Sequence, residues 1–204
     1  MESNLLHHDM VKSVLTAEDF RRVYEILDTP PLDFDCGTIC GKLCCQEYQP
    51  GVGMYLLPGE ERLFTGREAW LKWSFKRAEE QDFPPDWKGY VAFVECNSIC
   101  DRGRRPVQCR TFPLMPYLDK DGKLSVRLDV LNGPLLCPLV RYPRKYRLRA
   151  EFRRRTLEAW KLLITDPLIR SDVEWQSRIL DEDLRSPWRK LLRGVTTFRQ
   201  HKYQ

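Results

Sequence analysis

Histidine is nearly absent from the body of this chain. The three histidines, His7, His8 and His201, all lie close to its ends. A metal centre built on the central part of the chain would therefore be ligated by sulfur and not by imidazole. Ligation by sulfur alone narrows the candidates to zinc and iron–sulfur clusters.

Long hydrophobic runs are also missing. The segment MESNLLHHDM has no basic region followed by an apolar one, and no later stretch is long and apolar enough to cross a bilayer. We therefore expect a cytoplasmic protein without a membrane partner. In a reducing cytosol, clustered cysteines more often bind metal or do redox chemistry than form structural disulfides.

Several familiar catalytic motifs are absent. The chain contains no C-x2-C pair, which argues against a thioredoxin-like oxidoreductase, and no G-x-S-x-G, H-E-x-x-H or P-loop motif. These absences leave common hydrolase and nucleotide-binding mechanisms without their usual residues. Whether the protein is an enzyme stays open.

The composition is that of a folded protein of ordinary size. The chain has 204 residues, of which 42% are hydrophobic and 11% aromatic, enough to bury the core of one domain. We expect a single α+β domain over residues 1–204, with a small sheet that bears cysteine-containing loops and is packed by helices. Within it we distinguish a cysteine-rich, metal-binding region at 36–137 and a helical C-terminal part at 145–200.

Local patterns predict the individual elements. A helix begins at Thr16, whose hydroxyl can form a capping box with Asp19, and ends at two prolines. A hairpin joins 114–118 to 124–131 through Asp-Lys-Asp-Gly. The other expected elements are a strand at 54–57, a helix at 66–81, a strand at 90–94, a helix at 145–164, a helix that begins at Asp166-Pro167 with Val173, Gln176, Leu180 and Leu184 on one face, and a helix that begins at Ser186-Pro187.

Eight cysteines fall into three groups. Glycines follow the first two cysteines directly, at Gly37 and Gly41, and favour a tightly wrapped loop over a regular helix. Short, tightly turning segments can converge several thiolates on one centre. The candidate metal ligands are Cys36, Cys40, Cys44 and Cys45 in a C-x3-C-x3-C-C run, Cys96, Cys100 and Cys109 in a C-x3-C-x8-C run, and Cys137.

The spacing of these cysteines favours iron–sulfur over zinc. Zinc knuckles usually present C-x2-C pairs, whereas clusters tolerate wider and more irregular spacings. A four-thiolate site is negatively charged, and Arg105 and Arg110 beside Cys109 are candidates to compensate it; they could equally be ordinary surface arginines. Adjacent side chains diverge, so Cys44 and Cys45 are not both expected to serve one mononuclear centre.

The cysteine-containing segments resemble a known family. The run from Cys36 to Cys45, together with Arg105-Pro106-Val107-Gln108-Cys109-Arg110-Thr111-Phe112-Pro113, is similar to the YkgJ-type cysteine-cluster proteins, which have a C-x2-C-x2-C-C opening and an R-P-x-x-C-R-x-F-P signature. The signature matches completely, and the opening is wider by one residue in each gap. The resemblance covers about Cys36 to Cys137 and implies chelation of zinc or iron. A related enzyme is the flagellin lysine-N-methylase, but the C-x3-C-x2-C signature of radical S-adenosylmethionine enzymes is absent here.

A basic segment follows the last cysteine. Residues 141–161 hold nine basic side chains against Glu151 and Glu158, a local excess of nine minus two, or +7. Phe152, Thr156 and Leu163 follow the spacing of a buried stripe, so we favour the solvated face of an amphipathic helix over a surface that binds nucleic acid or another polyanion. The alternative function is thus a structural zinc module with a polyanion-binding helix.

Overall fold

The first helix is defined by its N-terminal cap. The computed structural model describes residues 9–45, 53–97, 102–131, 133 and 137–185. Helix α2 (Ala17–Ile26) follows Thr16, which accepts a hydrogen bond from the amide of Asp19, while the Asp19 carboxylate accepts one from the amide of Thr16. This capping box was predicted and is confirmed. Such a cap typically stabilises a helix by about 1 kcal/mol, and here the capped helix buries Phe20 and Val23.

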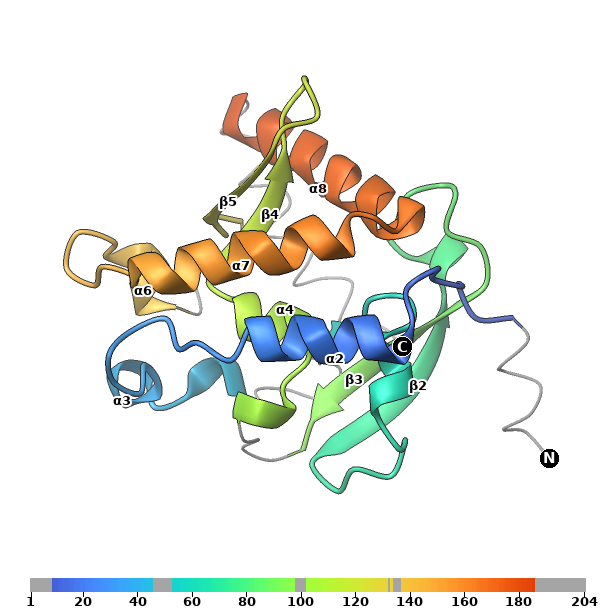
Figure 1. Ribbon diagram of the computed structural model, residues 1–204, viewed down its shortest axis with the longest axis horizontal. Helices are drawn as coiled ribbons and strands as arrows, with labels where there is room; N and C mark the ends of the chain where they lie inside the picture. The colour runs from blue at the N-terminus through green and yellow to red at the C-terminus, as the bar shows by residue number, and fades with distance from the viewer. Residues whose placement is uncertain (1–8, 46–52, 98–101, 132, 134–136, 186–204) are drawn as a thin grey trace.

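A three-stranded antiparallel sheet forms one side of the molecule (Figure 1). Strand β3 (Tyr90–Cys96) lies between β1 (Gly53–Tyr55) and β2 (Leu71–Arg77). The predicted strand at 90–94 is confirmed, and the residues from Val91 to Val94 are all buried. Close packing explains Gly53, because a Cβ there would stand 2.2 Å from the carbonyl oxygen of Val94.

The helix predicted at 66–81 is wrong. Residues 71–77 form β2, which pairs with β3 along its whole length, and the turn Ala78–Glu80 follows as a 3-10 helix (η3). The spacing of Trp70 and Trp73 fits a helical face, but the segment also alternates between polar and aromatic residues. Pairing with β3 satisfies the backbone groups along one edge of this segment and packs Trp73 against the sheet core, and this tertiary interaction overrides the helical period.

The predicted hairpin is present. Strands β4 (Leu114–Leu118) and β5 (Leu124–Leu128) pair antiparallel. The Asp119 carboxylate accepts hydrogen bonds from the amides of Asp121 and Lys123, and Gly122 takes a positive φ of 76°. The turn residues therefore close the hairpin by the local chemistry that the sequence indicated.

Two long helices cover the hairpin and α2. Helix α7 (Ala150–Leu163) packs on α2 and on the hairpin, and α8 (Pro167–Arg185) packs on β4 (Figure 1). The buried stripe of α7, which includes Phe152, Thr156 and Leu163, is confirmed. On the predicted face of α8, Val173 and Leu180 are buried, but Leu184 is 55% exposed, so the burial of that face ends before the last turn. The helix predicted from Ser186 lies outside the described residues.

Asp166 ties the segment before α2 to the start of α8. Its carboxylate accepts hydrogen bonds from the Ile169 amide at the start of α8 and from Ser13 and the Val14 amide near the N-terminus. The main core then forms where α2, α7 and α8 meet, around Phe20, Leu163 and Ile169. The remaining short elements are α3 (Gly37–Cys40), η1 (Leu43–Cys45), η2 (Glu60–Leu63), η4 (Arg102–Arg104), α4 (Val107–Thr111) and α6 (Pro138–Arg141).

The architecture is α+β, as predicted: small antiparallel sheets with helices, and long helices in the C-terminal part. Most of the cysteines lie in the short elements and at strand ends, and not in the long helices. None of the helices in the described part of the chain is both long and apolar enough to span a membrane.

Candidate metal centre

The first three cysteines lie on one tightly wound turn. Asp35 begins it, because its carboxylate accepts a hydrogen bond from the Gly37 amide at 2.9 Å. One turn of helix α3 carries the chain from Cys36 to Cys40, and the Cys40 Sγ lies 4.0 Å from the Cys36 carbonyl oxygen.

Two consecutive left-handed residues then reverse the chain. Gly41 has φ 63° and Lys42 has φ 61°, a conformation that glycine adopts easily and lysine rarely. The Lys42 amide donates to the Gly37 carbonyl at 3.0 Å, and its ammonium group lies 3.7 Å from the Asp35 carboxylate. The glycines were predicted to wrap a loop; instead Gly37 begins a one-turn helix and Gly41 ends it, and the chain leads into η1, which carries Cys44.

A fourth cysteine comes to this turn from a distant part of the sequence. Cys137 precedes α6, and α3 and α6 lie at the same end of the molecule (Figure 1). Burial raises the pKa of Cys36 to about 11, and negative charge on Cys44 and Cys137 adds to this rise. We call Cys36, Cys40, Cys44 and Cys137 the four-thiol group.

The charges of this group act on Cys137 as well. Burial raises the pKa of the Cys137 thiol, and the charges of Cys44 and Cys40 raise it further. The amides of Leu139 and Val140 oppose this effect by donating hydrogen bonds to the thiolate. The charges of the neighbouring thiols therefore make it harder for Cys36 and Cys137 to ionise, which is the situation that a bound cation reverses.

An arginine lies beside the group. Arg102 is largely buried, and its Nη2 donates to the carbonyl oxygens of Thr29 at 2.6 Å and Arg110 at 3.2 Å. Burial lowers its pKa, the neighbouring Arg105 lowers it further, and Cys36 opposes the change. The Arg102 Nε is buried without a hydrogen-bond partner among the described residues. This N–H is suited to donate to a thiolate or sulfide, as groups around metal-bound sulfur commonly do.

The four sulfurs do not form a closed ligand sphere in the structure. Within the described residues, no three histidine, cysteine, aspartate or glutamate side chains stand close enough together to hold a metal ion. The four-thiol group is coupled through the charges that raise the pKa of Cys36 and Cys137, but its sulfurs do not converge on one point in the described structure.

Two other cysteines lie apart from this group. The Cys109 Sγ, on α4, is 3.4 Å from the Met54 Sδ on β1. Cys96, at the end of β3, packs with Met54 against the small core around Trp70 and Val94. Cys109 and Cys96 therefore approach the region of Met54 from two elements. Cys100 lies outside the described residues, as does the side chain of Cys45.

The signature around Cys109 has a structural role that the sequence did not indicate. Arg110 is 2% exposed, and its guanidinium donates to the carbonyl oxygens of Arg105, Gly103 and Tyr24. It also stacks over the Tyr24 ring, 4.0 Å from the ring centroid. These contacts hold η4 and the start of α4 against α2. Arg110 was predicted to offset the negative charge of the thiolates. The contacts described for it are with carbonyl oxygens and an aromatic ring, and Arg105 supplies one of those carbonyls.

Glu60 completes this arrangement, and its role was not predicted from the sequence. Its carboxylate is fully buried and accepts hydrogen bonds from the Tyr24 hydroxyl at 2.8 Å and from the amides of Val107 and Leu57 at 2.6 Å and 3.1 Å. Burial raises the pKa of Glu60, and the three donors oppose the rise. We call Tyr24, Glu60 and Arg110 the buried brace. No local motif marks Glu60, because its partners come from three different segments.

Comparison with known proteins yields no relative for this chain: no protein-family model, no curated protein and no solved structure matches it.

Proposed function

We propose that this chain is a metal-binding protein in which Cys36, Cys40, Cys44 and Cys137 hold an iron–sulfur cluster or zinc. The observation that carries the proposal is the arrangement of these four thiols, which come from the α3 turn, η1 and the start of α6 into one electrostatic environment. Four cysteines are the ligand set of both structural zinc sites and cubane clusters.

The chemistry of the site supports a cation. A metal removes the thiol protons and replaces the mutual repulsion of the thiolates by attraction. Arg102 would offset the remaining negative charge, and its Nε–H, which has no hydrogen-bond partner among the described residues, is a donor for a ligand sulfur. Wide C-x3-C spacing favours the cluster over zinc. Thiolate ligation of this kind fits a reducing compartment such as the cytoplasm, and the resemblance of the signature to the YkgJ-type proteins points to chelation as well.

Anaerobic purification followed by metal analysis tests the proposal. We expect either iron with acid-labile sulfide or zinc, bound in stoichiometric amount. Absorption and paramagnetic resonance spectra separate the two, because an iron–sulfur cluster is coloured and redox-active and zinc is silent. A colourless protein with neither element in stoichiometric amount would exclude the proposed function.

Paired cysteine variants locate the centre. Cys137→Ser removes the ligand that comes from the distant segment and should abolish stoichiometric binding. Cys109→Ser is the matched control, because Cys109 contacts Met54 and lies outside the four-thiol group. Full metal content in Cys137→Ser together with its loss in Cys109→Ser would move the site to the region of Cys96 and Cys109.

A second candidate function is binding of a polyanion such as nucleic acid by the basic segment. Three of its nine basic residues, Arg149, Arg154 and Arg155, form ion pairs with neighbouring carboxylates. The other six form none within the part of the chain that the structure describes, and they are exposed: Arg141, Arg144, Lys145, Arg147, Arg153 and Lys161. Several of them gather in the loop before α7 beside Tyr142, which is 49% exposed.

Salt dependence tests this second candidate. Binding to a single-stranded oligonucleotide should weaken steeply with added salt, because contacts to phosphate release counterions. Replacing Arg144 and Lys145 by glutamate should weaken it further, whereas Arg154→Glu, in a residue already paired, should have less effect. Absence of binding at low salt would end this candidate.

A further inference from the structure

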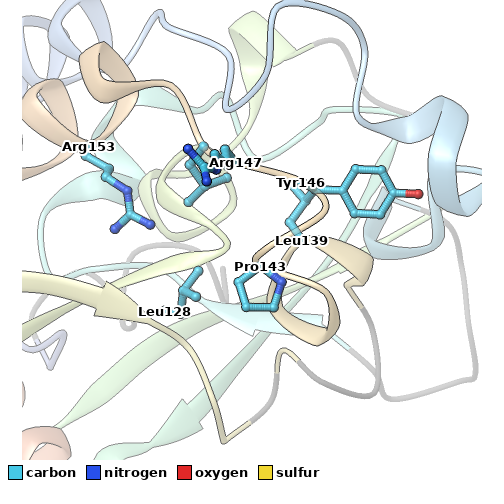
Figure 2. A pocket seen from close by; sticks show the side chains of 7 residues that line it. Leu128, Leu139, Pro143, Tyr146, Arg147 and Arg153 are labelled. Carbon is cyan, nitrogen blue, oxygen red and sulfur yellow. The ribbon is translucent and has the colours of Figure 1, made fainter.

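A pocket opens between α6, α7 and the end of β5. Its volume is about 240 Å³, enough for a compact metabolite and not for a large cofactor. Figure 2 shows it from close by. Its lining residues are Leu128, Leu139, Pro143, Tyr146, Arg147, Leu148 and Arg153.

The charges of this pocket have one sign. Arg147 and Arg153 both line it, and no carboxylate is among its lining residues in the part of the chain that the structure describes. Neither arginine forms an ion pair within the described residues, in contrast to Arg154 on the same helix, which pairs with Glu151 and Glu158. In Figure 2 Arg153 extends from α7 toward Leu128, and Arg147 lies on the same side of the hollow. Two guanidiniums on the wall of one pocket present positive charge and several N–H donors to an anion that enters it.

Apart from Tyr146, the rest of the lining is apolar. Leu128 comes from β5, Leu139 from α6 and Leu148 from the loop before α7, while Pro143 lies across from the arginines. This combination of an apolar wall with a few convergent charged groups is typical of sites for small organic ligands.

The loop that carries Arg147 is fastened on both sides. The Tyr146 amide donates to the Tyr142 carbonyl at 3.0 Å, which closes a turn before the arginine. After it, the Arg149 amide donates to the Pro31 carbonyl at 3.0 Å, and the Arg149 Nε lies 3.1 Å from the Asp33 carboxylate. Arg147 is therefore presented by backbone that is already ordered, which lowers the entropy cost of binding.

We propose that this pocket binds a compact organic anion, a carboxylate or phosphate attached to an aromatic or branched apolar group. Arg147 and Arg153 bind the anionic end, and Leu128, Leu148 and Pro143 contact the apolar part. The wider hollow around Arg77 and Tyr90 is a weaker candidate, because Asp9 also lines it and Arg77 is paired with Glu79. This inference does not depend on either function proposed above.

Calorimetric titration of the full chain as purified tests the pocket, with phenyl phosphate, benzoate, inorganic phosphate and benzyl alcohol as probes. We expect phenyl phosphate or benzoate to bind, inorganic phosphate to bind more weakly, and benzyl alcohol not to bind. Comparison of the first two probes tells whether the anion is a phosphate or a carboxylate. Both arginines are exposed, so their replacement should leave the fold intact.

Variants then assign the contacts. Arg153→Gln and Arg147→Gln should each weaken binding about tenfold to a hundredfold, the range for a charged hydrogen bond, while Arg154→Gln should bind like the wild type. Leu128→Ala should reduce the preference for phenyl phosphate over inorganic phosphate. The proposal is overturned if neither organic anion binds at millimolar concentration, if Arg154→Gln weakens binding as much as Arg153→Gln, or if only an oligonucleotide binds.

Discussion

Removal of the Glu60 carboxylate tests the buried brace. In Glu60→Ala, the Tyr24 hydroxyl and the amides of Val107 and Leu57 all lose their acceptor. An unsatisfied buried donor costs about 1–3 kcal/mol. Water that enters the space left by the side chain will recover part of this cost, so we expect the free energy of unfolding to fall by about 3–5 kcal/mol.

Glu60→Gln separates the hydrogen bonds from the charge. Its amide oxygen can still accept from Tyr24 and Val107, but its NH₂ group then faces the Leu57 amide, so one hydrogen bond is lost. Since burial raises the pKa of Glu60, the neutral side chain also avoids the cost of a buried charge. We expect a loss of about 1–2 kcal/mol, clearly smaller than that of Glu60→Ala.

Urea unfolding followed by tryptophan fluorescence measures both values. For a chain of this length, 3–5 kcal/mol corresponds to a melting temperature lower by about 6–20 °C. Glu158→Ala is the control, because it removes only an exposed pair with Arg154 and Arg155 and should cost about 0–1 kcal/mol. If Glu60→Ala unfolds within about 1 kcal/mol of the wild type, or if Glu60→Gln is the more damaging change, the account of the brace is refuted.

Three further predictions concern pH, packing and metal. Burial raises the pKa of Asp172 from its ordinary value of 3.8 to about 7, and the charges of Asp82 and Asp86 add to the rise. An acid whose pKa is raised in the folded state stabilises the fold fully only below its unfolded pKa, so the free energy of unfolding should fall as the pH rises from about 4 to about 8. Urea titrations at several pH values should show this fall, and Asp172→Asn should flatten it. Leu163 is fully buried in the main core, so Leu163→Ala should cost about 2–5 kcal/mol, and a loss below about 1 kcal/mol would show that the site collapses around the cavity. If the four-thiol group holds a metal, a chelator under reducing conditions should lower the melting temperature of the wild type but not that of Cys137→Ser. Equal falls in the melting temperature of both proteins would speak against that site.

Local chemistry explains which parts of the fold could be predicted. The capping box of Thr16 and Asp19 and the turn that begins at Asp119 involve residues a few positions apart, and both are present as expected. The structure of the segment at 66–81 could not be predicted from local patterns. Its tryptophans fit a helical period, but pairing with β3 decides the outcome, and that partner lies outside any local window.

The same division applies to the candidate site. The amino-acid sequence alone determined the chemical type of the candidate ligands, sulfur without histidine, and the close spacing of Cys36, Cys40 and Cys44, because both are properties of composition and neighbouring positions. Only the tertiary structure decided that Cys137 comes close enough to Cys36 for its charge to raise the pKa of that thiol, that Cys109 lies instead against Met54, and that Arg110 is a buried structural residue. These contacts join segments far apart in the chain. They form because α2, α7 and the sheets pack together, and a short stretch of sequence carries no information on that packing.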